Sequence, residues 1–197
     1  MEAGSIVLDL SEANLPLTAR GLFGSDRPLE VEFGVGKGRF LLDWAMAHPE
    51  VGVIGVERAR KYVELPATRA LRLGIGNVRL VHTTAEDMLF RCLAPESMVA
   101  IHAYFPDPWP KKRHHKRRFF RSENVARLAE VLPPGGLLRV KTDHEGYAAV
   151  IAVLLEAESR LAPVAADEAF VGVPPTNFEI KYGRDSRPIR RFAYRRR

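Results

Sequence analysis

The sequence of 197 residues contains a single cysteine, Cys92, so an internal disulfide is excluded. A chain without disulfides fits a reducing compartment. No apolar run approaches the roughly 20 residues that a membrane-spanning helix needs, and the first residues lack the basic start and apolar core of a secretory signal. We therefore expect a cytoplasmic protein with no membrane partner.

Metal-ligand spacing is also missing from the sequence. His114 and His115 are adjacent, and adjacent residues rarely chelate one ion. No Cys or further His stands at ligand spacing from them. His82 and His102 fall within strand patterns and are expected to be core histidines. We therefore expect no metal site.

Acidic residues are absent from two stretches, 111–118 and 190–197, which together hold 11 of the 30 Lys and Arg residues. The remainder carries 19 basic and 24 acidic residues, a net charge of −5. Basic charge that is concentrated in two patches of a mildly acidic body favours a polyanionic partner. The patch at 190–197 is either a second phosphate contact or a charged edge strand that resists aggregation.

Strand and helix patterns alternate through most of the chain. Strands are predicted at 29–33, 51–56, 78–82, 98–105 and 137–141, and helices at 39–47, 59–73, 86–92, 123–131 and 147–159. Ser122 is the predicted N-cap of helix 123–131. This order predicts an α/β fold. We expect a Rossmann-like, doubly wound, mostly parallel seven-stranded sheet with a C-terminal antiparallel hairpin.

The two ends of the chain show weaker patterns. Residues 1–28 have no clear period and are expected to form an irregular lead-in to one domain over residues 1–197. The tail is expected to be rich in β-structure, at 170–173 and 189–195. By pattern alone, 176–181 is predicted to be an ordinary strand.

A glycine turn follows the first predicted strand. Gly34, Gly36 and Gly38 would let the backbone approach a ligand closely, and Glu57 ends the second strand, where a carboxylate can accept ribose hydroxyls. Glu32 would repel a diphosphate but attract the ammonium of a methionine moiety. The turn therefore favours S-adenosylmethionine over NAD. The alternative is an unliganded turn in which Glu32 caps a neighbouring helix.

A proline-rich corner follows the fourth strand. Pro106, Pro108 and Pro110 force the chain out of the sheet as a stiff loop that carries Asp107 and Trp109. Six cations follow between residues 111 and 118, as a phosphate backbone would require. Trp109 could stack on a base or pack under its own loop.

These motifs, together with Thr142-Asp143 and Thr176-Asn-Phe-Glu179, resemble those of the bacterial tRNA (guanine-N7-)-methyltransferases over nearly all of residues 28–195. The resemblance implies a Rossmann-like methyltransferase fold and methyl transfer from S-adenosylmethionine to guanine 46 in the variable loop of tRNA. It implies cofactor contacts at Glu32, Gly34, Gly36, Gly38, Glu57, Thr84 and Asp107. Asp107 would also be the catalytic carboxylate. Substrate contacts are implied at Lys111, Asp143, Thr176, Asn177, Phe178 and Glu179.

Two residues depart from the family pattern, and the smaller departure is Ser186, where glycine is expected before the last strand and which lies outside the residues described below. Thr84 stands where members usually have Asp, near the expected position of the adenine amino group. Its hydroxyl is a weaker acceptor than a carboxylate, and Glu86 or Asp87 could take over that role.

Two other functions stay open: a non-catalytic RNA-binding protein on the same fold, and a nucleotide-dependent oxidoreductase. Whether the protein is a monomer or a homodimer also stays open.

Overall fold

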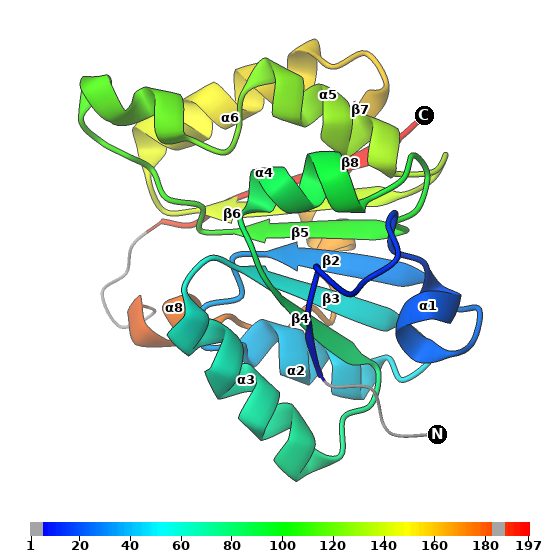
Figure 1. Ribbon diagram of the computed structural model, residues 1–197. Coiled ribbons are helices and arrows are strands. Elements are labelled where there is room, and N and C mark those ends of the chain that lie inside the picture. The colour runs from blue at the N-terminus through cyan, green and yellow to red at the C-terminus, as the bar shows by residue number, and fades with distance from the viewer. Residues whose placement is uncertain (1–5, 183–187) are drawn as a thin grey trace.

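The computed structural model describes residues 6–182 and 188–197 (Figure 1). Its elements, in chain order, are β1 (Val7–Leu8), α1 (Ala19–Phe23), β2 (Leu29–Phe33), α2 (Arg39–Ala47), β3 (Gly52–Glu57), α3 (Arg60–Leu73), β4 (Val78–His82), α4 (Ala85–Asp87), η1 (Met88–Cys92), β5 (Ala100–Tyr104), η2 (Lys112–Arg117), α5 (Ser122–Val131), β6 (Leu137–Thr142), α6 (Glu145–Ala157), β7 (Leu161–Pro163), α7 (Ala166–Ala169), α8 (Asn177–Tyr182) and β8 (Arg190–Arg196).

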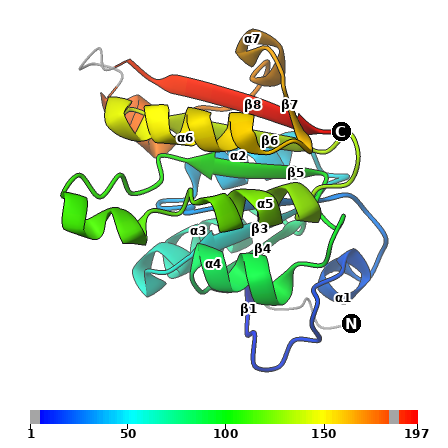
Figure 2. The same cartoon turned by 90° about the horizontal axis from the view of Figure 1, so that it is seen from above.

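Within the described residues, eight strands form one sheet in the order β1-β4-β3-β2-β5-β6-β8-β7. The first six strands of this order pair in parallel, and β8 pairs antiparallel with both β6 and β7. Helices α4, α5 and α6 cover one face, and α2 and α3 cover the other (Figures 1 and 2). The predicted α/β class, the mostly parallel sheet and the C-terminal antiparallel pair are confirmed.

Several local predictions were wrong. The eighth strand is β1, which lies with α1 in the stretch expected to be irregular. Helix α5 begins at Ser122, and its N-cap is Arg121. In the tail, residues 170–172 form a turn, and β7 is the strand that pairs with β8. Among the described strands, β7 pairs only with Tyr194–Arg196 of β8, whereas Arg190–Phe192 pair with β6 alone, so the charged edge strand that was considered for residues 190–197 is present in the first half of β8 and not in the second.

The segment 177–182 is a helix and not a strand because its first turn is a capping box. The Thr176 hydroxyl oxygen accepts from the Glu179 backbone N–H at 3.1 Å, and the Glu179 carboxylate accepts from the Thr176 N–H at 2.8 Å. A Thr followed three residues later by Glu is a sequence signature of a helix start. This signal was present in the sequence and outweighs the weak strand pattern.

Side chains alternate across the central strands, and one face of the sheet is unusually polar. Val31, Ile101 and Val140 point into the apolar core beneath α4, α5 and α6. The opposite face carries a set that we call the polar stripe: Glu30, Glu32, His102, Tyr104, Arg139 and Lys141. The strand register places Glu32 beside His102, His102 beside Arg139, and Tyr104 beside Lys141.

The polar stripe is covered by α2 and by the C-terminal tail. Phe40 and Trp44 of α2 pack against His102, with ring centroids 4.8 and 5.6 Å away. Arg139 donates through Nε to the Ala169 carbonyl at the end of α7, at 2.7 Å. Lys141 pairs with Glu179 in α8. Both short tail helices are therefore held by cations of β6.

Gly38, the N-cap of α2, allows α2 to pack closely against α3. It has φ of +74°, and a Cβ there would lie 2.3 Å from the Pro66 Cβ. We expect Gly38→Ala to lower the free energy of unfolding by about 3 kcal/mol, from the left-handed backbone and the overlap together. The measurement is urea-induced unfolding.

Gly74→Ala is the matched control. Gly74 has φ of +66°, but no atom lies within 4 Å of the position that a Cβ would occupy there, so only the backbone cost of about 1–2 kcal/mol is expected. Equal losses in both variants would show that contact with Pro66 does not limit position 38.

Candidate functional site

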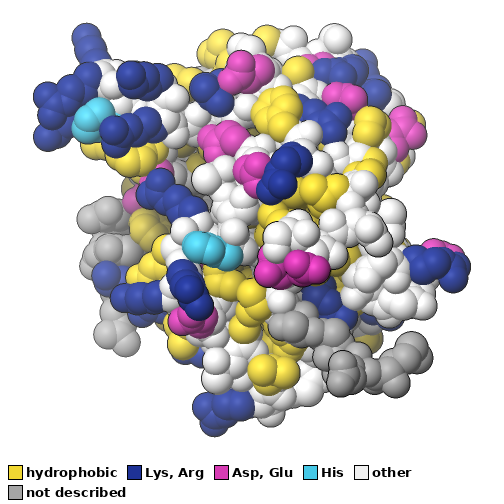
Figure 3. All heavy atoms as spheres, viewed as in Figure 1, with side chains coloured by type: hydrophobic (Ala, Val, Ile, Leu, Met, Phe, Trp, Pro, Cys, Tyr) yellow, Lys and Arg dark blue, Asp and Glu magenta, His cyan; other side chains and the backbone are white. Residues whose placement is uncertain are grey.

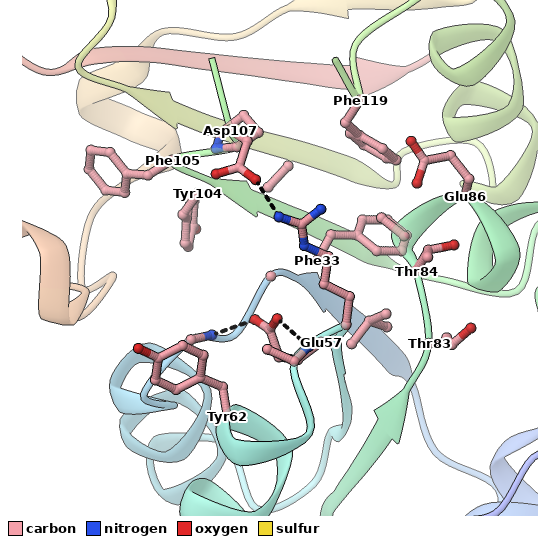
Figure 4. A pocket seen from close by; sticks show the side chains of 18 of the residues that line it. Phe33, Glu57, Tyr62, Thr83, Thr84, Glu86, Tyr104, Phe105, Asp107 and Phe119 are labelled. Atoms are coloured by element: carbon pink, nitrogen blue, oxygen red, sulfur yellow. Dashed lines mark hydrogen bonds and ion pairs between the residues drawn. The ribbon is translucent and has the colours of Figure 1, made fainter. Parts of the chain in front are cut away.

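The carboxyl ends of β2, β3, β4 and β5 border a cavity of about 430 Å³ (Figure 4). Its walls come from the segments that follow these strands: Gly34 and Gly36, 57–59, 83–86 and 104–107. This edge of an open α/β sheet is where such folds bind ligands. The motifs that the sequence places at four separate strand ends therefore meet around one space.

Glu57 lies on the floor of this cavity at the end of β3 (Figure 4). One carboxylate oxygen accepts from the Gly36 N–H at 3.1 Å and the other from the Ala59 N–H at 3.0 Å. Gly34 and Gly36 have φ of +81° and +51°, which glycine adopts without strain. The turn thus orients Glu57, and each of its oxygens keeps a lone pair for a ligand hydroxyl.

Thr84 lines the same cavity and also caps α4. Its hydroxyl oxygen accepts from the Asp87 N–H at 3.0 Å. Asp87 accepts from the Thr83 hydroxyl at 2.6 Å and pairs with Arg91 at 2.9 Å, and it does not line the cavity. Glu86 does line it and points across it toward Phe119 (Figure 4). Of the two candidate acids, Glu86 is therefore the carboxylate that is open to the cavity.

The proline-rich corner forms the wall opposite Glu57. Asp107 has a side chain that is 61% exposed, and it pairs with Arg58 at 3.0 Å. Phe105 and Trp109, on either side of it, have φ of +53° and +43°. Such a backbone conformation is costly for a bulky residue and concentrates at functional sites. The strained corner holds the carboxylate at the mouth of the cavity.

Trp109 is held by cations. The guanidinium carbons of Arg58 and Arg117 lie 5.9 and 5.0 Å from its ring centroid, and His114 contacts it edge-on at 5.8 Å. The ring lines the cavity and is half-buried. It therefore packs on its own loop region while it remains in reach of a ligand.

A second cavity, of about 770 Å³, adjoins the first and shares Gly34, Gly36, Tyr62, Tyr104, Phe105 and Asp107 with it. Its far wall is the start of α8, with Thr176, Asn177 and Phe178. Phe178 stacks on Phe105 with ring centroids 4.3 Å apart. The two cavities are parts of one crevice.

Glu32 lines the second cavity and is 3% exposed. Among the residues that the structure describes, its Oε2 is buried without a hydrogen-bond partner, which is uncommon for a carboxylate. Burial and then the neighbouring Glu57 carboxylate hold the pKa of Glu32 well above its usual value, and Lys141 opposes them. The orphaned oxygen fits a cationic ligand group, such as an ammonium, within the crevice.

Four of the predicted site residues do not line either cavity: Gly38, Lys111, Asp143 and Glu179. Gly38 contributes the N-cap of α2, and Glu179 turns away toward Lys141. Lys111 is exposed at the start of η2, and Asp143 follows β6. The remaining predicted residues lie together around the crevice.

A buried relay of polar side chains lies beneath the crevice. The Glu30 Oε2 accepts from Trp44 Nε1 and lies 2.8 Å from His102 Nε2, and His102 Nδ1 lies 2.9 Å from the Tyr104 hydroxyl. Burial lowers the pKa of His102 although Glu30 opposes it. Against the effect of burial, hydrogen bonds from His102 and Trp44 lower the pKa of Glu30. A neutral His102 that donates to Glu30 and accepts from Tyr104 satisfies all three groups.

The histidine prediction is thus right for His102, which is fully buried, and wrong for His82, which is exposed at the end of β4 and contacts the Arg58 carbonyl.

Cations gather on the arm that carries η2, at the upper left of Figure 3. Lys112, Arg113, Lys116 and Arg117 are exposed there. Arg118 is buried, donates to the Pro108 carbonyl at 2.8 Å, and stacks over Tyr147. It anchors the proline-rich corner and is not available to a phosphate.

The cavity-lining residues that the sequence analysis did not assign to the site include Arg58, Tyr62 and Tyr104. Arg58 follows Glu57 directly, so its place at the end of β3 was a usable signal. Tyr104 ends β5, next to the proline-rich corner, and was interpreted only as part of a buried strand. Nothing in the sequence around Tyr62 distinguishes it from an ordinary helix residue.

In the part of the chain that the structure describes, no helix has both the length and the apolar composition that crossing a membrane requires.

Comparisons with known proteins agree with this arrangement. A family model described as "Putative methyltransferase" matches residues 26–191. The tRNA (guanine-N(7)-)-methyltransferase of Mycobacterium avium (strain 104) is 39% identical over 185 residues, which cover 92% of this chain and 71% of that protein. The same enzyme of Mycobacterium tuberculosis (strain ATCC 25618 / H37Rv) is 38% identical over 186 residues, covering 91% and 71%.

Solved structures show the same fold at lower identity. The aminoglycoside resistance methyltransferase NpmB1 superposes with a TM-score of 0.61 at 23% identity, covering 87% of this chain and 88% of that one. The 16S rRNA methyltransferase KamB gives a TM-score of 0.64 at 16% identity, covering 89% and 91%. The Rossmann-like methyltransferase fold that was expected is confirmed.

The buried relay of Glu30, His102 and Tyr104 makes the free energy of unfolding depend on pH. His102 is neutral when folded but has a pKa of about 6.5 when unfolded, so below that pH the unfolded chain binds a proton that the folded one does not. The contribution of His102 to stability should fall as pH drops from 6.5 to 5, by up to about 1.4 kcal/mol per pH unit, whereas Glu32, whose pKa is raised, contributes in the opposite direction. Below that range Glu30 adds to the loss, because its lowered pKa stabilises the fold only while it is ionised.

His102→Gln removes the titrating group, so the slope of unfolding free energy against pH should be less positive than in the wild type between pH 5 and 6.5, whatever the absolute stability. Urea unfolding at several pH values measures that slope. An unchanged slope would mean that His102 is protonated in the folded protein.

Proposed function

This chain belongs to the tRNA (guanine-N7-)-methyltransferase family, and from that membership we propose that it transfers a methyl group from S-adenosylmethionine to N7 of a guanine in tRNA. The target that we propose is guanine 46 in the variable loop. The observation that carries the proposal is that the carboxylates Glu32, Glu57 and Asp107 line one crevice, at whose edge the cations of η2 begin.

The residues present fit the methyl donor along the whole crevice. S-adenosylmethionine supplies an electrophilic methyl group on a sulfonium. Glu57 would accept the ribose hydroxyls, Thr84 and Glu86 would face the adenine, and Gly34 and Gly36 would let the chain pass close to the ligand. The orphaned Oε2 of Glu32 would accept the ammonium of the methionine moiety. The residues that would hold the cofactor are thus distributed over the two cavities.

The acceptor chemistry explains why no general base is needed. Guanine N7 has an in-plane lone pair and carries no proton at neutral pH, so the chain has mainly to align the reactants. Such alignment can supply roughly 7–11 kcal/mol. Methylation leaves a positive charge on the purine, and a preorganised carboxylate stabilises charge that grows in the transition state. Asp107 is the carboxylate that we assign to this role.

Arg58 must release Asp107 for this role to be filled. A guanidinium beside the carboxylate competes with the purine for it and repels the developing positive charge. Both partners are more than 60% exposed, and exposed ion pairs contribute only about 0–1 kcal/mol. A phosphate of the bound RNA can therefore draw Arg58 away at little cost.

The tRNA backbone would follow the exposed cations of η2 and Lys111, which give affinity but little sequence choice. Trp109 offers a ring on which a base could stack. Asp143, Thr176, Asn177, Phe178 and Glu179 are proposed substrate-side residues around α8 and β6. We further propose that residues 1–197 form a single domain. A tRNA substrate is consistent with an enzyme that acts in the cytoplasm.

The test is to incubate the protein with S-adenosylmethionine and an unmodified tRNA transcript, and then to map the methylated nucleotide. Methylation of guanine 46 at N7 is expected. Methylation of a different guanine at N7 would support the proposed reaction but contradict guanine 46 as its target. Absence of methylation with retained tRNA binding would favour a non-catalytic RNA-binding protein. Stabilisation by NAD and not by S-adenosylhomocysteine in a thermal-shift measurement would favour an oxidoreductase.

Asp107→Ala should abolish turnover while tRNA binding survives, because the variant loses the carboxylate at the crevice but keeps every exposed cation of η2. Single-turnover methylation and a filter-binding measurement separate the two effects. Asp107→Asn, which keeps the shape and removes the charge, should lose turnover as well. Near-normal rates in either variant would show that Asp107 is not catalytic.

Thr84→Asp should bind S-adenosylhomocysteine a few-fold more tightly than the wild type. Asp caps a helix as well as Thr does, and a charged acceptor for the adenine amino group is worth about 1 kcal/mol more than a neutral one. Thr84→Val is the matched control, which loses both the cap and the acceptor. If calorimetry gives Thr84→Asp the same affinity as Thr84→Val, residue 84 does not contact the ligand.

A further inference from the structure

Lys141 of β6 is a buried cation just behind the crevice. Its Nζ lies 3.1 Å from both carboxylate oxygens of Glu179, and the two side chains are only 3% and 11% exposed. The rings of Tyr104 and Phe170 cover the ammonium, with centroids 4.7 and 5.3 Å away. Lys141 itself does not line either cavity. Its influence on the crevice therefore passes through two neighbouring residues, Glu179 and Glu32.

One of those residues controls the start of α8. Glu179 closes the capping box with Thr176, so the ion pair fixes the first helical turn against the sheet. That turn presents Thr176, Asn177 and Phe178 to the second cavity. Releasing Glu179 would leave the substrate-side wall held mainly by the stack between Phe178 and Phe105.

The other residue is Glu32, which also lies on the polar stripe. The strand register places His102 of β5 beside it, and the other ionisable groups whose charge acts on it are Glu57 on β3, Tyr104 on β5 and Lys141 on β6. Lys141 in turn faces Glu179, Glu32 and Arg191 of β8. Lys37, Arg39 and Lys181 line the second cavity but are exposed. Lys141 is thus paired with Glu179, and its positive charge also acts on Glu32, whose Oε2 has no hydrogen-bond partner among the described residues and stays available to a ligand cation.

We propose that Lys141 is a positioning residue that couples the two halves of the site: it fixes the substrate-side turn through Glu179 and places a positive charge beside the donor-side carboxylate Glu32. The proposal rests on the function proposed above, because it takes the ammonium of the methyl donor as the ligand of Glu32. Without Lys141, a proton should compete better with that ammonium for Glu32.

The donor half is tested by titration calorimetry with two ligands between pH 6 and 8.5. S-adenosylhomocysteine carries the amino-acid ammonium, and 5′-methylthioadenosine lacks it. We expect Lys141→Met to lower the affinity for S-adenosylhomocysteine about tenfold at pH 7. The affinity should recover as the pH rises and Glu32 ionises. The affinity for 5′-methylthioadenosine should not change, and Lys141→Arg should restore most of the lost affinity.

Glu179→Gln should change the affinity for S-adenosylhomocysteine in the opposite direction from Lys141→Met, and its side-chain oxygen can still accept the capping-box hydrogen bond from Thr176. It leaves the whole charge of Lys141 to Glu32, so S-adenosylhomocysteine should bind as tightly as to the wild type or more tightly at pH 6. This variant keeps the test open if Lys141→Met does not fold. Equal weakening of both ligands in Lys141→Met, or a Glu179→Gln variant that weakens S-adenosylhomocysteine at pH 6, would overturn the donor half.

The substrate half is tested by steady-state methylation of tRNA at saturating donor. Lys141→Met should raise KM for tRNA about tenfold, and Arg139→Met should leave it within twofold. Arg139 is the matched control because it lies two residues away on the same face but holds α7 and not α8. Equal KM values for Lys141→Met and Arg139→Met would overturn this half. If the wild-type protein binds neither S-adenosylhomocysteine nor 5′-methylthioadenosine, the proposed methyl donor is wrong. That result differs from every outcome that would overturn the role of Lys141.

Discussion

Charge balance across the polar stripe is the constraint on which the rest of this structure depends. A sheet face that packs on helices is normally apolar, yet here six polar side chains lie on β2, β5 and β6 beneath α2 and the tail. Buried charges are tolerated only when they are paired and hydrogen-bonded. Each member except Glu32 has such a partner: Glu30 has Trp44 and His102, Arg139 has a carbonyl of α7, and Lys141 has Glu179.

Glu32 is the exception, and it is the member that borders the crevice. An unsatisfied carboxylate in an otherwise satisfied array indicates a group that is reserved for a ligand. The same array orients Tyr104, which lines both cavities, through its contact with His102. The side chains that line the crevice are therefore hydrogen-bonded to side chains in the core, from Tyr104 through His102 to Glu30.

The parts of this site that could be predicted from sequence are those at strand ends. Glu57, the glycine turn and Asp107 follow buried strands directly, and parallel strands bring their carboxyl ends to one edge of the sheet. Lys141 could not be found in this way. A lysine in an alternating strand is typical of a solvent-facing position, and only the position of the tail shows that its face is buried. Residues 177–182 were predicted to be a strand because the capping box of Thr176 and Glu179 was not recognised in the sequence.

The two cations of β6 hold the tail by different chemistry, and this difference has a consequence for how the tail can vary. Arg139 binds a main-chain carbonyl of α7, which every amino acid supplies, so the identity of Ala169 is largely unconstrained by that bond. Lys141 binds a side chain, so position 179 must remain an acid as long as position 141 is a base. The bond to Arg139 therefore places no side-chain requirement on α7, whereas residues 141 and 179 should change only as a pair.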